Sequence, residues 1–337
     1  MLFLARVVPA LLAASSLVQA ASVVSRTNDD FLSGFLETLC EANLTILADN
    51  YKRIAETKEG KLVIDSLEKG GDITLLAPEN CAFDSDHPKL DANVLLYNAL
   101  QGNIDSGFKS NTKVIRRDGA AQSHSVVESQ AGISGGGARK RQGPSYQVQT
   151  VDQTFAPNSR KRWSSSSIQI GQAVGTAKFV KRITYKKIII LVIDTLLSLP
   201  GGVSDLLCKP LINGAPDGFS KFSAALKKAD LLDEVENGKQ VTIFVPIDDS
   251  FGDNDNLSKD DLSCFLKNHV IYGKRVFSPL FRSISDATAA SGKQLKFTSE
   301  NGMDYVCCGK NKSMVLRSDV ISGNGVLHVI DKPLKCD

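Results

Sequence analysis

The chain lacks a strong excess of charge of either sign. Its 337 residues include 40 lysine and arginine residues against 37 aspartate and glutamate residues, which gives a formal net charge of +3. A chain this close to neutral has no overall electrostatic attraction to nucleic acid or to an anionic membrane. We therefore expect no nucleic-acid partner. The hydrophobic share of 42% is enough for globular cores, and the length suits two domains.

Apolar runs long enough to cross a bilayer are also missing. Beyond the first 20 residues, the longest apolar run covers 188–199, is interrupted by Asp194 and falls short of a membrane span. The residues from Pro333 onward contain no hydrophobic tail of the kind that signals a glycolipid anchor. The sequence therefore predicts neither a transmembrane segment nor a glycolipid anchor.

Motifs for metal binding or cofactor binding are scarce. The sequence contains no His-Glu-x-x-His motif, no cysteine pairs at zinc-binding spacing and no phosphate-binding glycine loop. Residues 253–256, Asp-Asn-Asp-Asn, resemble part of a calcium loop, but the glycine and the closing glutamate of such a loop are absent. We interpret this segment as a polar turn, and we expect no metal, no cofactor and no enzyme activity.

One short pattern points to a serine hydrolase. Residues 132–136, Gly-Ile-Ser-Gly-Gly, match the Gly-x-Ser-x-Gly motif. That motif marks a nucleophile only where a strand precedes it and a helix follows it, and here it lies in a glycine tract. A hydrolase built on Ser134, His328 and Asp331 is therefore a remote alternative. It requires the Ser134 hydroxyl within hydrogen-bond reach of an imidazole.

Residues 1–20 have the composition of a secretory signal peptide. Arg6 precedes an apolar region over 7–17, and Val18-Gln19-Ala20 resembles a signal-peptidase cleavage site. The sequence thus predicts a secreted protein, located outside the cell or in the cell wall.

Three triplets match the acceptor motif for N-glycosylation. Such triplets are common by chance, but in a secreted chain we expect at least one to be modified. The acceptors are Asn43, Asn256 and Asn311.

An internal repeat organises the chain. Val192-Ile193-Asp194 recurs 137 residues later as Val329-Ile330-Asp331, each time at the end of a short apolar stretch. Upstream, residues 73–83 and 241–251 both contain a β-rich run, then a proline, then a phenylalanine at the same distance. An offset of this size is typical of two copies of one domain, because solenoid repeats are much shorter.

These two motifs resemble those of the fasciclin family. The family has a Thr-x-Phe-Ala-Pro-x-Asn-x-Ala-Phe type run upstream and an Asn-Gly-x-x-His-x-Ile-Asp-x-x-Leu type run downstream. The second copy matches well, whereas the first is degraded and has Leu191 at the histidine position. The matching residues are Thr242, Phe244, Pro246, Phe251, Asn324, Gly325, His328, Ile330, Asp331 and Leu334 in the second copy, and Thr74, Pro78, Asn80, Ala82, Phe83, Ile193 and Asp194 in the first.

The resemblance implies two fasciclin-like domains of α+β class, each a small β-sandwich or wedge flanked by helices. Short strands mixed with helices, without regular βαβ order, favour the same class. We place the first domain at 29–197, a linker at 198–204 and the second domain at 205–336. Residues 129–167 are basic and rich in glycine and serine, and we expect a long exposed insertion there. Its triplets at 139–141 and 160–162 are candidate sites for a dibasic processing protease, or simply solvated loop.

Two histidines belong to the motifs. His269 lies in a predicted helix over 262–270, and His328 lies in the last predicted strand. A metal or acid–base pair is one interpretation. We favour the other, a buried histidine that bonds to backbone and joins two elements, and in the family the downstream histidine is chiefly structural. Asn268 stands where tyrosine often precedes the histidine, a departure from the pattern associated with adhesion in some members.

Seven cysteines in a secreted chain predict disulfides. Adjacent residues on a strand point to opposite faces, so only one of Cys307 and Cys308 can readily reach a given partner. The other thiol is either buried or available for pairing between molecules. The expected pairs are Cys40 with Cys81, Cys208 with Cys264, and Cys336 with either Cys307 or Cys308.

The resemblance implies a non-enzymatic adhesion or interaction protein of the cell surface, cell wall or extracellular matrix. Its partners would be cell-surface or cell-wall proteins or polysaccharides, and two domains would offer multivalent contact to weak partners. An alternative is a soluble carrier that binds a small apolar ligand between helices and sheet. A continuous internal pocket would favour the carrier.

Overall fold

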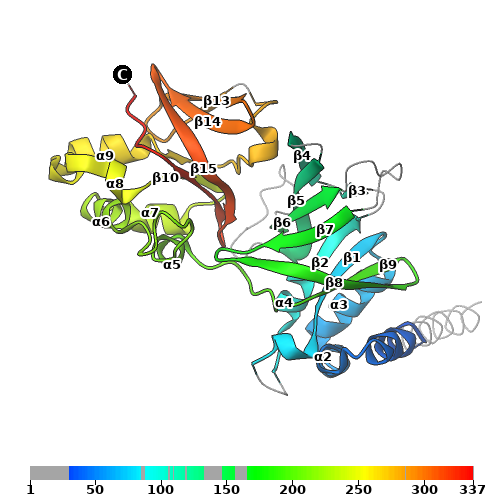
Figure 1. The fold of residues 1–337 in the computed structure, drawn as a ribbon. Coiled ribbons are helices and arrows are strands. Elements are labelled where there is room, and N and C mark those ends of the chain that lie inside the picture. The colour runs from blue at the N-terminus through cyan, green and yellow to red at the C-terminus, as the bar shows by residue number, and fades with distance from the viewer. Residues whose placement is uncertain are drawn as a thin grey trace, which may run out of the picture.

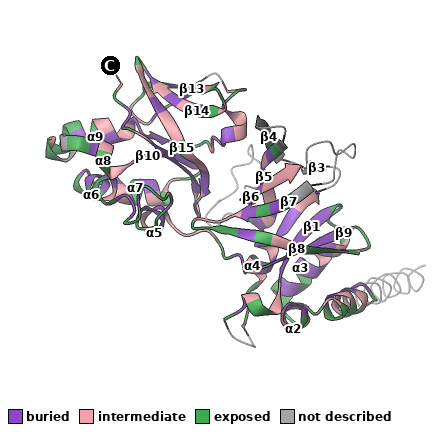
Figure 2. Cartoon of the chain, viewed as in Figure 1, coloured by how far each residue is buried: buried purple, intermediate pink, exposed green. Residues whose placement is uncertain are grey.

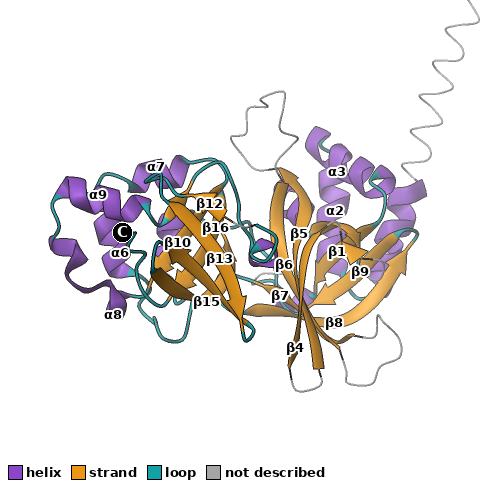
Figure 3. Cartoon of the chain, turned by 90° about the horizontal axis from the view of Figure 1, so that it is seen from above, coloured by secondary structure: helices purple, strands orange, loops and turns teal. Residues whose placement is uncertain are grey.

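The computed structural model describes residues 30–84, 88–104, 107–108, 110–117, 120–132, 146–155, 165–284 and 286–336. The predicted signal peptide, Ser134 and the two basic triplets lie outside these residues. The described residues build a nine-stranded sheet and a seven-stranded sheet (Figure 1). Helices gather at the two outer ends of the molecule and the strands lie between them (Figure 3). The predicted α+β class is confirmed.

The first half of the chain forms four helices within the described residues and the nine-stranded sheet. The sheet order is β3-β2-β1-β9-β8-β7-β6-β5-β4, and β2 also pairs with β5. The helices cover 30–41, α2 (Thr45–Ala55), α3 (Lys58–Lys69) and α4 (Ala92–Tyr97), with a 3-10 turn η1 (Asn80–Ala82). The strands are β1 (Ile73–Pro78), β2 (Ala99–Asn103), β3 (Gly107–Phe108), β4 (Ser110–Arg117), β5 (Ala120–Gly132), β6 (Tyr146–Phe155), β7 (Ser165–Gly171), β8 (Thr176–Tyr185) and β9 (Ile188–Ile193).

Strands β1 and β9 are buried at every position because the sheet separates two cores. Alternate side chains of a strand point to opposite faces. Ile188, Ile190 and Val192 therefore face the helices, while Ile189 and Leu191 face a second core formed with β5 to β8. This explains why both strands appear in the sequence as continuous apolar runs.

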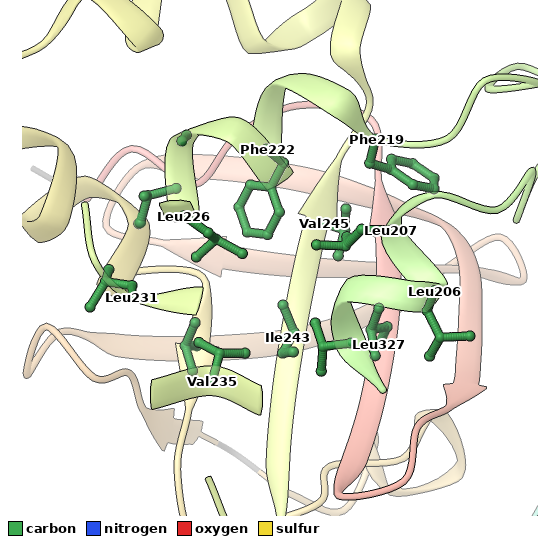
Figure 4. Packing of buried hydrophobic residues seen from close by; sticks show 14 of the residues in the cluster. Leu206, Leu207, Phe219, Phe222, Leu226, Leu231, Val235, Ile243, Val245 and Leu327 are labelled. Atoms are coloured by element: carbon green, nitrogen blue, oxygen red, sulfur yellow. The ribbon is translucent and has the colours of Figure 1, made fainter. Parts of the chain in front are cut away.

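The second half forms the seven-stranded sheet, in the order β11-β10-β16-β15-β14-β13-β12. The helices α5 to α7 cover one face of β10 and β16 with leucine, valine and phenylalanine side chains (Figure 4). The helical elements are α5 (Val203–Leu207), α6 (Ser220–Lys228), α7 (Leu232–Asn237), α8 (Asp248–Phe251), η2 (Gly252–Asn256), α9 (Lys259–Lys267) and η3 (Ser278–Leu280). The strands are β10 (Val241–Pro246), β11 (Val270–Ile271), β12 (Asp286–Thr288), β13 (Gln294–Glu300), β14 (Met303–Cys308), β15 (Asn311–Ile321) and β16 (Gly325–Ile330).

The two sheets share one plan at their centres. In the first, β1 pairs in parallel with β9, and Pro78 lies opposite Ile193. In the second, β10 pairs in parallel with β16, and Pro246 lies opposite Ile330. Each of these pairs is flanked by antiparallel partners, β2 and β8 in the first sheet and β11 and β15 in the second. The two motif-bearing strands of each copy are therefore neighbours in space.

Three details of the sequence interpretation need correction. Within 129–167, residues 146–155 are not exposed loop, because they form β6 and bury Val148 and Val151. The second detail is His269, which does not lie in a helix: α9 ends at Lys267, and Val270 already belongs to β11. The third is that the helix α5 begins at Val203, within the span predicted as linker.

Candidate functional site

The motif threonines make equivalent hydrogen bonds in both copies. The Thr242 hydroxyl donates to the Lys274 carbonyl at 2.8 Å and accepts the Val276 N–H at 2.9 Å. The Thr74 hydroxyl donates to the Gly102 carbonyl at 3.0 Å and accepts the Ile104 N–H at 3.2 Å. Both side chains are fully buried. Each threonine thus joins the central strand to the end of its antiparallel neighbour or to the segment that follows it.

The motif aspartates are equivalent as well. Asp331 Oδ1 accepts the Met314 N–H, and Asp194 Oδ1 accepts the Lys178 N–H, both at 2.7 Å. The backbone N–H of each aspartate donates back to the same neighbouring residue. The bond from the Lys178 N–H holds the pKa of Asp194 below its usual value. These carboxylates therefore terminate the final strand of each copy.

The asparagine and glycine of the downstream motif close the turn into β16. The side-chain amide of Asn324 donates to the carbonyls of Val235, Glu236 and Gly238 at 2.8–2.9 Å, and so binds the C-terminal end of α7. A Cβ atom at Gly325 would lie 2.0 Å from the Val241 carbonyl oxygen. Only glycine therefore fits at this close approach of two strands.

Both motif histidines are buried and neutral. The Asp319 N–H donates to His328 Nδ1 at 3.3 Å, so Nε2 carries the proton and donates to the Val276 carbonyl at 2.8 Å. For His269, Nε2 accepts the Leu334 N–H at 2.8 Å, and Nδ1 donates to the Phe265 carbonyl at 3.1 Å. Burial lowers the pKa of both side chains, that of His269 to about 4. Neither ring has a nitrogen left for a metal or a substrate.

The first copy replaces each histidine. Asn98 occupies the position in the first copy that His269 occupies in the second. The Asn98 carbonyl accepts the Leu76 N–H of β1, just as the His269 carbonyl accepts the Phe244 N–H of β10. The Asn98 amide donates to the carbonyls of Val94 and Leu197, so it also connects the end of a helix to the segment after the last strand. Leu191 replaces His328 and packs in an apolar core.

The remaining motif residues pack in the core or lie at the ends of the central strands. Phe244 stacks against the His328 ring with centroids 5.3 Å apart, and Phe251 is fully buried at the end of α8. Phe83 is buried directly after η1 in the first copy. The residues that end the central strands or lie beyond them are Pro78, Pro246, Ile330 and Leu334.

No catalytic constellation forms among the described residues. His328 bonds to backbone, and the Asp331 carboxylate bonds to the Met314 N–H, so these two side chains are not paired with each other. Ser134 lies outside the described residues. No group of three histidine, cysteine or carboxylate side chains within the described part could hold a metal ion.

Residues 217–336 match the family model of the Fasciclin domain. This part of the chain is a fasciclin domain. It contains the second copy of both motifs, from Thr242 to Leu334, so the geometry described above for that copy belongs to this domain.

Similar proteins include fungal and bacterial chains. Over 131 residues, the chain is 32% identical to the fasciclin-like arabinogalactan protein elcF of Phaeosphaeria nodorum. This match covers 36% of this chain and 38% of the relative. Over 123 residues, the chain is 32% identical to protein sll1483 of Synechocystis sp. This match covers 34% of this chain and 65% of the relative. Among solved structures, a FAS1 domain pair from the insect cell adhesion molecule fasciclin I is similar over 85% of this chain and 95% of that chain, with a TM-score of 0.38 and 16% identity. The chain thus spans less than two thirds of these curated relatives.

The fasciclin domain contacts the first sheet through a buried ionic cluster that the sequence did not indicate. His124 of β5 lies between two carboxylates, with Nδ1 2.6 Å from Asp152 and Nε2 2.9 Å from Asp319 of β15. Both partners are acceptors, so both ring nitrogens carry protons. Burial alone would lower the pKa of His124, but the two carboxylates outweigh it and raise that pKa to about 10.

Asp319 occupies a bulge of β15 that directs its carboxylate toward the first sheet. The register of β15 with β16 shifts between Arg317 and Val320, and Asp319 has a φ of +58°. Its carboxylate accepts the N–H and the hydroxyl of Ser278 as well as the His124 proton. Burial would raise the pKa of Asp319, but these partners lower it to about 2.

Further bonds surround this ion pair. Lys113 pairs with Asp304, and both side chains are only 9% exposed. Arg317 donates to the carbonyls of Gln172 and Ala173 in the β7–β8 turn. An apolar cluster joins the two sheets at the same place, formed by Val126, Val148, Phe277 and Val326.

A cavity of about 230 Å³ lies beside this interface. Its lining mixes polar side chains such as Gln149 and Lys209 with apolar ones such as Leu197, Leu199 and Ile321. The cavity lies between the two halves of the chain, whereas the carrier hypothesis requires a pocket between helices and sheet.

The cysteines follow the prediction only in part. Cys308 forms a disulfide with Cys336, which decides between the two neighbouring candidates, and Cys307 is a half-buried free thiol. The predicted pair Cys208–Cys264 does not form, because both residues are exposed free cysteines. The pair Cys40–Cys81 is also absent, since both thiols face solvent and that of Cys81 lies 3.5 Å from the Glu79 carboxylate.

The predicted glycosylation acceptors differ in exposure. Asn43 and Asn256 are exposed, whereas Asn311 is half-buried and its side-chain amide donates to the Lys335 carbonyl. No helix within the described residues is both long enough and apolar enough to cross a membrane.

Proposed function

We propose that this chain is a secreted, non-enzymatic adhesion protein built from two tandem fasciclin-like domains. The domains would cover 29–197 and 205–336, joined by a linker at 198–204. The main support for the tandem arrangement is that the central strands pair in the same register in both halves, with Pro78 opposite Ile193 and Pro246 opposite Ile330. The equivalent bonds of the two motif threonines and the two motif aspartates support it.

The non-enzymatic part of the proposal rests on what the motif side chains do. In the second copy, both ring nitrogens of His269 and His328 are used by backbone groups. In the first copy, leucine and asparagine stand at these positions without loss of the strand plan. These observations support a structural role for the two histidines.

The partners we propose are proteins or polysaccharides of the cell surface, cell wall or matrix. Several relatives are named fasciclin-like arabinogalactan proteins, among them those from Phaeosphaeria nodorum and Arthroderma benhamiae. Such partners suit a secreted chain whose contacts are individually weak. Two domains held at a fixed distance then raise the avidity.

An equilibrium binding isotherm tests this proposal. The purified mature chain is incubated with intact cells and with an isolated wall fraction, and the bound amount is measured against the free concentration. Saturable binding to either material supports adhesion. Only non-saturable binding to both, together with a small apolar molecule that co-purifies with the chain, would favour the carrier.

A further inference from the structure

Charge is distributed unevenly along this nearly neutral chain. Residues 101–200 contain 15 lysine and arginine residues against 5 aspartate and glutamate residues, whereas the other 237 residues contain 25 against 32. A cationic segment within a neutral protein can attract anions locally even though the net charge predicts no attraction. The described part of this segment shows where some of the positive charge lies.

Five cations lie along β8 and the turn that follows it. We call them the β8 cation row: Lys178, Lys181, Arg182, Lys186 and Lys187. All five are exposed, and β8 lies between β7 and β9 in the first sheet (Figure 2). A strand rises about 3.3 Å per residue, so the row extends over roughly 30 Å along the chain. Lys181 and Arg182 are adjacent on the strand and therefore point to opposite faces of it.

The four lysines of the row are not neutralised by ion pairs with described carboxylates. The Lys181 ammonium donates to the Ala42 carbonyl at 2.7 Å, and the Lys186 ammonium lies 5.0 Å from the centre of the Phe31 ring. Neither of these lysines, nor Lys178 or Lys187, forms an ion pair with a described carboxylate. Asp194 is the carboxylate beside the row, and its Oδ1 is held by the Lys178 N–H.

Part of β8 is also an open edge of the sheet. Residues 176–178 pair with β7, but residues 179–185 pair only with β9, after a bulge between Phe179 and Lys181. Lysines on such an edge discourage pairing with another strand. That role accounts for Lys181 on the strand, but not for Lys186 and Lys187, which lie in the turn beyond it.

We propose that the β8 cation row binds an anionic polysaccharide, a linear polymer of sugars that carry carboxylate or sulfate groups. This inference rests on the proposed function and specifies one of its partners. Cations extended along one strand suit a linear polyanion better than a flat anionic surface. Anionic lipids are concentrated in the cytoplasmic leaflet, which a secreted chain does not meet.

Each contact in such a complex is solvent-exposed and therefore weak, so affinity depends on several cations acting together. Binding should weaken as salt is added, because ions screen exposed charges more strongly at higher ionic strength. The salt dependence is consequently part of the prediction.

The test compares two charge-matched variants of the full mature chain. The first replaces Lys178, Lys181, Lys186 and Lys187 with glutamine. The control replaces four exposed lysines of the second half with glutamine: Lys221, Lys227, Lys239 and Lys332. Both variants lose the same charge. Melting temperatures establish that both variants are folded before binding is measured.

The probes are polygalacturonate, neutral dextran and vesicles that contain phosphatidylserine. We expect the wild-type chain and the control to bind polygalacturonate, and the row variant to bind about tenfold more weakly, the loss that four exposed contacts predict. Equal weakening of both variants, or binding to the vesicles but not to polygalacturonate, would overturn the inference.

If all three proteins still bind isolated wall equally well, the inference fails while the proposed function stands. If wild type binds neither cells nor wall, the proposed function itself fails.

Discussion

The Nε2 atom of His124 lies 2.9 Å from Asp319 Oδ2, so an ion pair joins the nine-stranded sheet to the seven-stranded sheet. The Asp319 side chain is fully buried, and the His124 side chain is 20% exposed. A buried carboxylate depends on its cation, because water cannot replace that partner. This relationship makes the contact between the two halves sensitive to both substitution and pH.

Substitution of His124 should destabilise the protein strongly. His124→Gln leaves the Asp319 carboxylate buried without a cation, and loss of one partner of a buried ion pair costs about 3–5 kcal/mol. Asp152→Asn is the control, because the Asp152 side chain is 44% exposed and its loss should cost less than about 1 kcal/mol. Urea unfolding of the full mature chain measures both. Similar losses for the two variants would contradict the assigned role of Asp319.

The same pair predicts how stability changes with pH. The pKa of His124 is raised from 6.5 to about 10, so its contribution is complete below pH 6.5 and is lost as the pH rises through 10. The pKa of Asp319 is lowered from 3.8 to about 2, so its contribution is present above pH 3.8 and is lost as the pH falls through 2. The melting-temperature difference between wild type and His124→Gln should be largest near pH 5–6 and shrink toward pH 10. A difference that stays constant from pH 6 to pH 10 would rule this out.

Asparagine should substitute for His269 better than alanine does. Asn98 already bonds the end of a helix and the segment after the last strand in the first copy. His269→Ala leaves the Leu334 N–H and the Phe265 carbonyl without their side-chain partner, which should cost about 1–3 kcal/mol. His269→Asn should retain at least half of that stability, measured by urea unfolding. Equal losses for the two variants would show that the imidazole itself is required.

The Cys308–Cys336 disulfide should stabilise the fasciclin domain, whereas the Cys307 thiol should not. The disulfide connects residues 28 apart, and closing a loop of that length is worth about 3.6 kcal/mol in the chain-entropy model. We expect Cys336→Ser to lower the melting temperature by several degrees. Cys307→Ser, with its half-buried free thiol, should leave it nearly unchanged. Two equal shifts would mean that the pairing is different.

The strands that carry the motifs could be predicted because their signals are local. Residues 241–246 and 325–330 are apolar runs bounded by proline, glycine and asparagine, and they form β10 and β16. The fasciclin domain follows from the same residues. Strand β6 was missed because it has only two valines, Val148 and Val151, among Gln, Thr and Asp residues, within a region whose glycine and basic content suggested loop.

The contact between the two halves could not be predicted because it has no local pattern. His124 and Asp319 are 195 positions apart, and each lies in an ordinary polar stretch. Asp319 reaches His124 only because a bulge turns it out of the β15 ladder. The position of such a bulge depends on how two strands pair and not on the residues within one of them.

Adhesion itself is tested most directly by attachment of coated beads to intact cells under flow. Beads that carry the folded mature chain are compared with beads that carry the reduced, heat-unfolded chain at the same surface density. The account predicts that the folded chain retains beads against flow and that free mature chain competes for retention. Equal retention of both bead types, or retention that free chain does not reduce, would contradict an adhesive function.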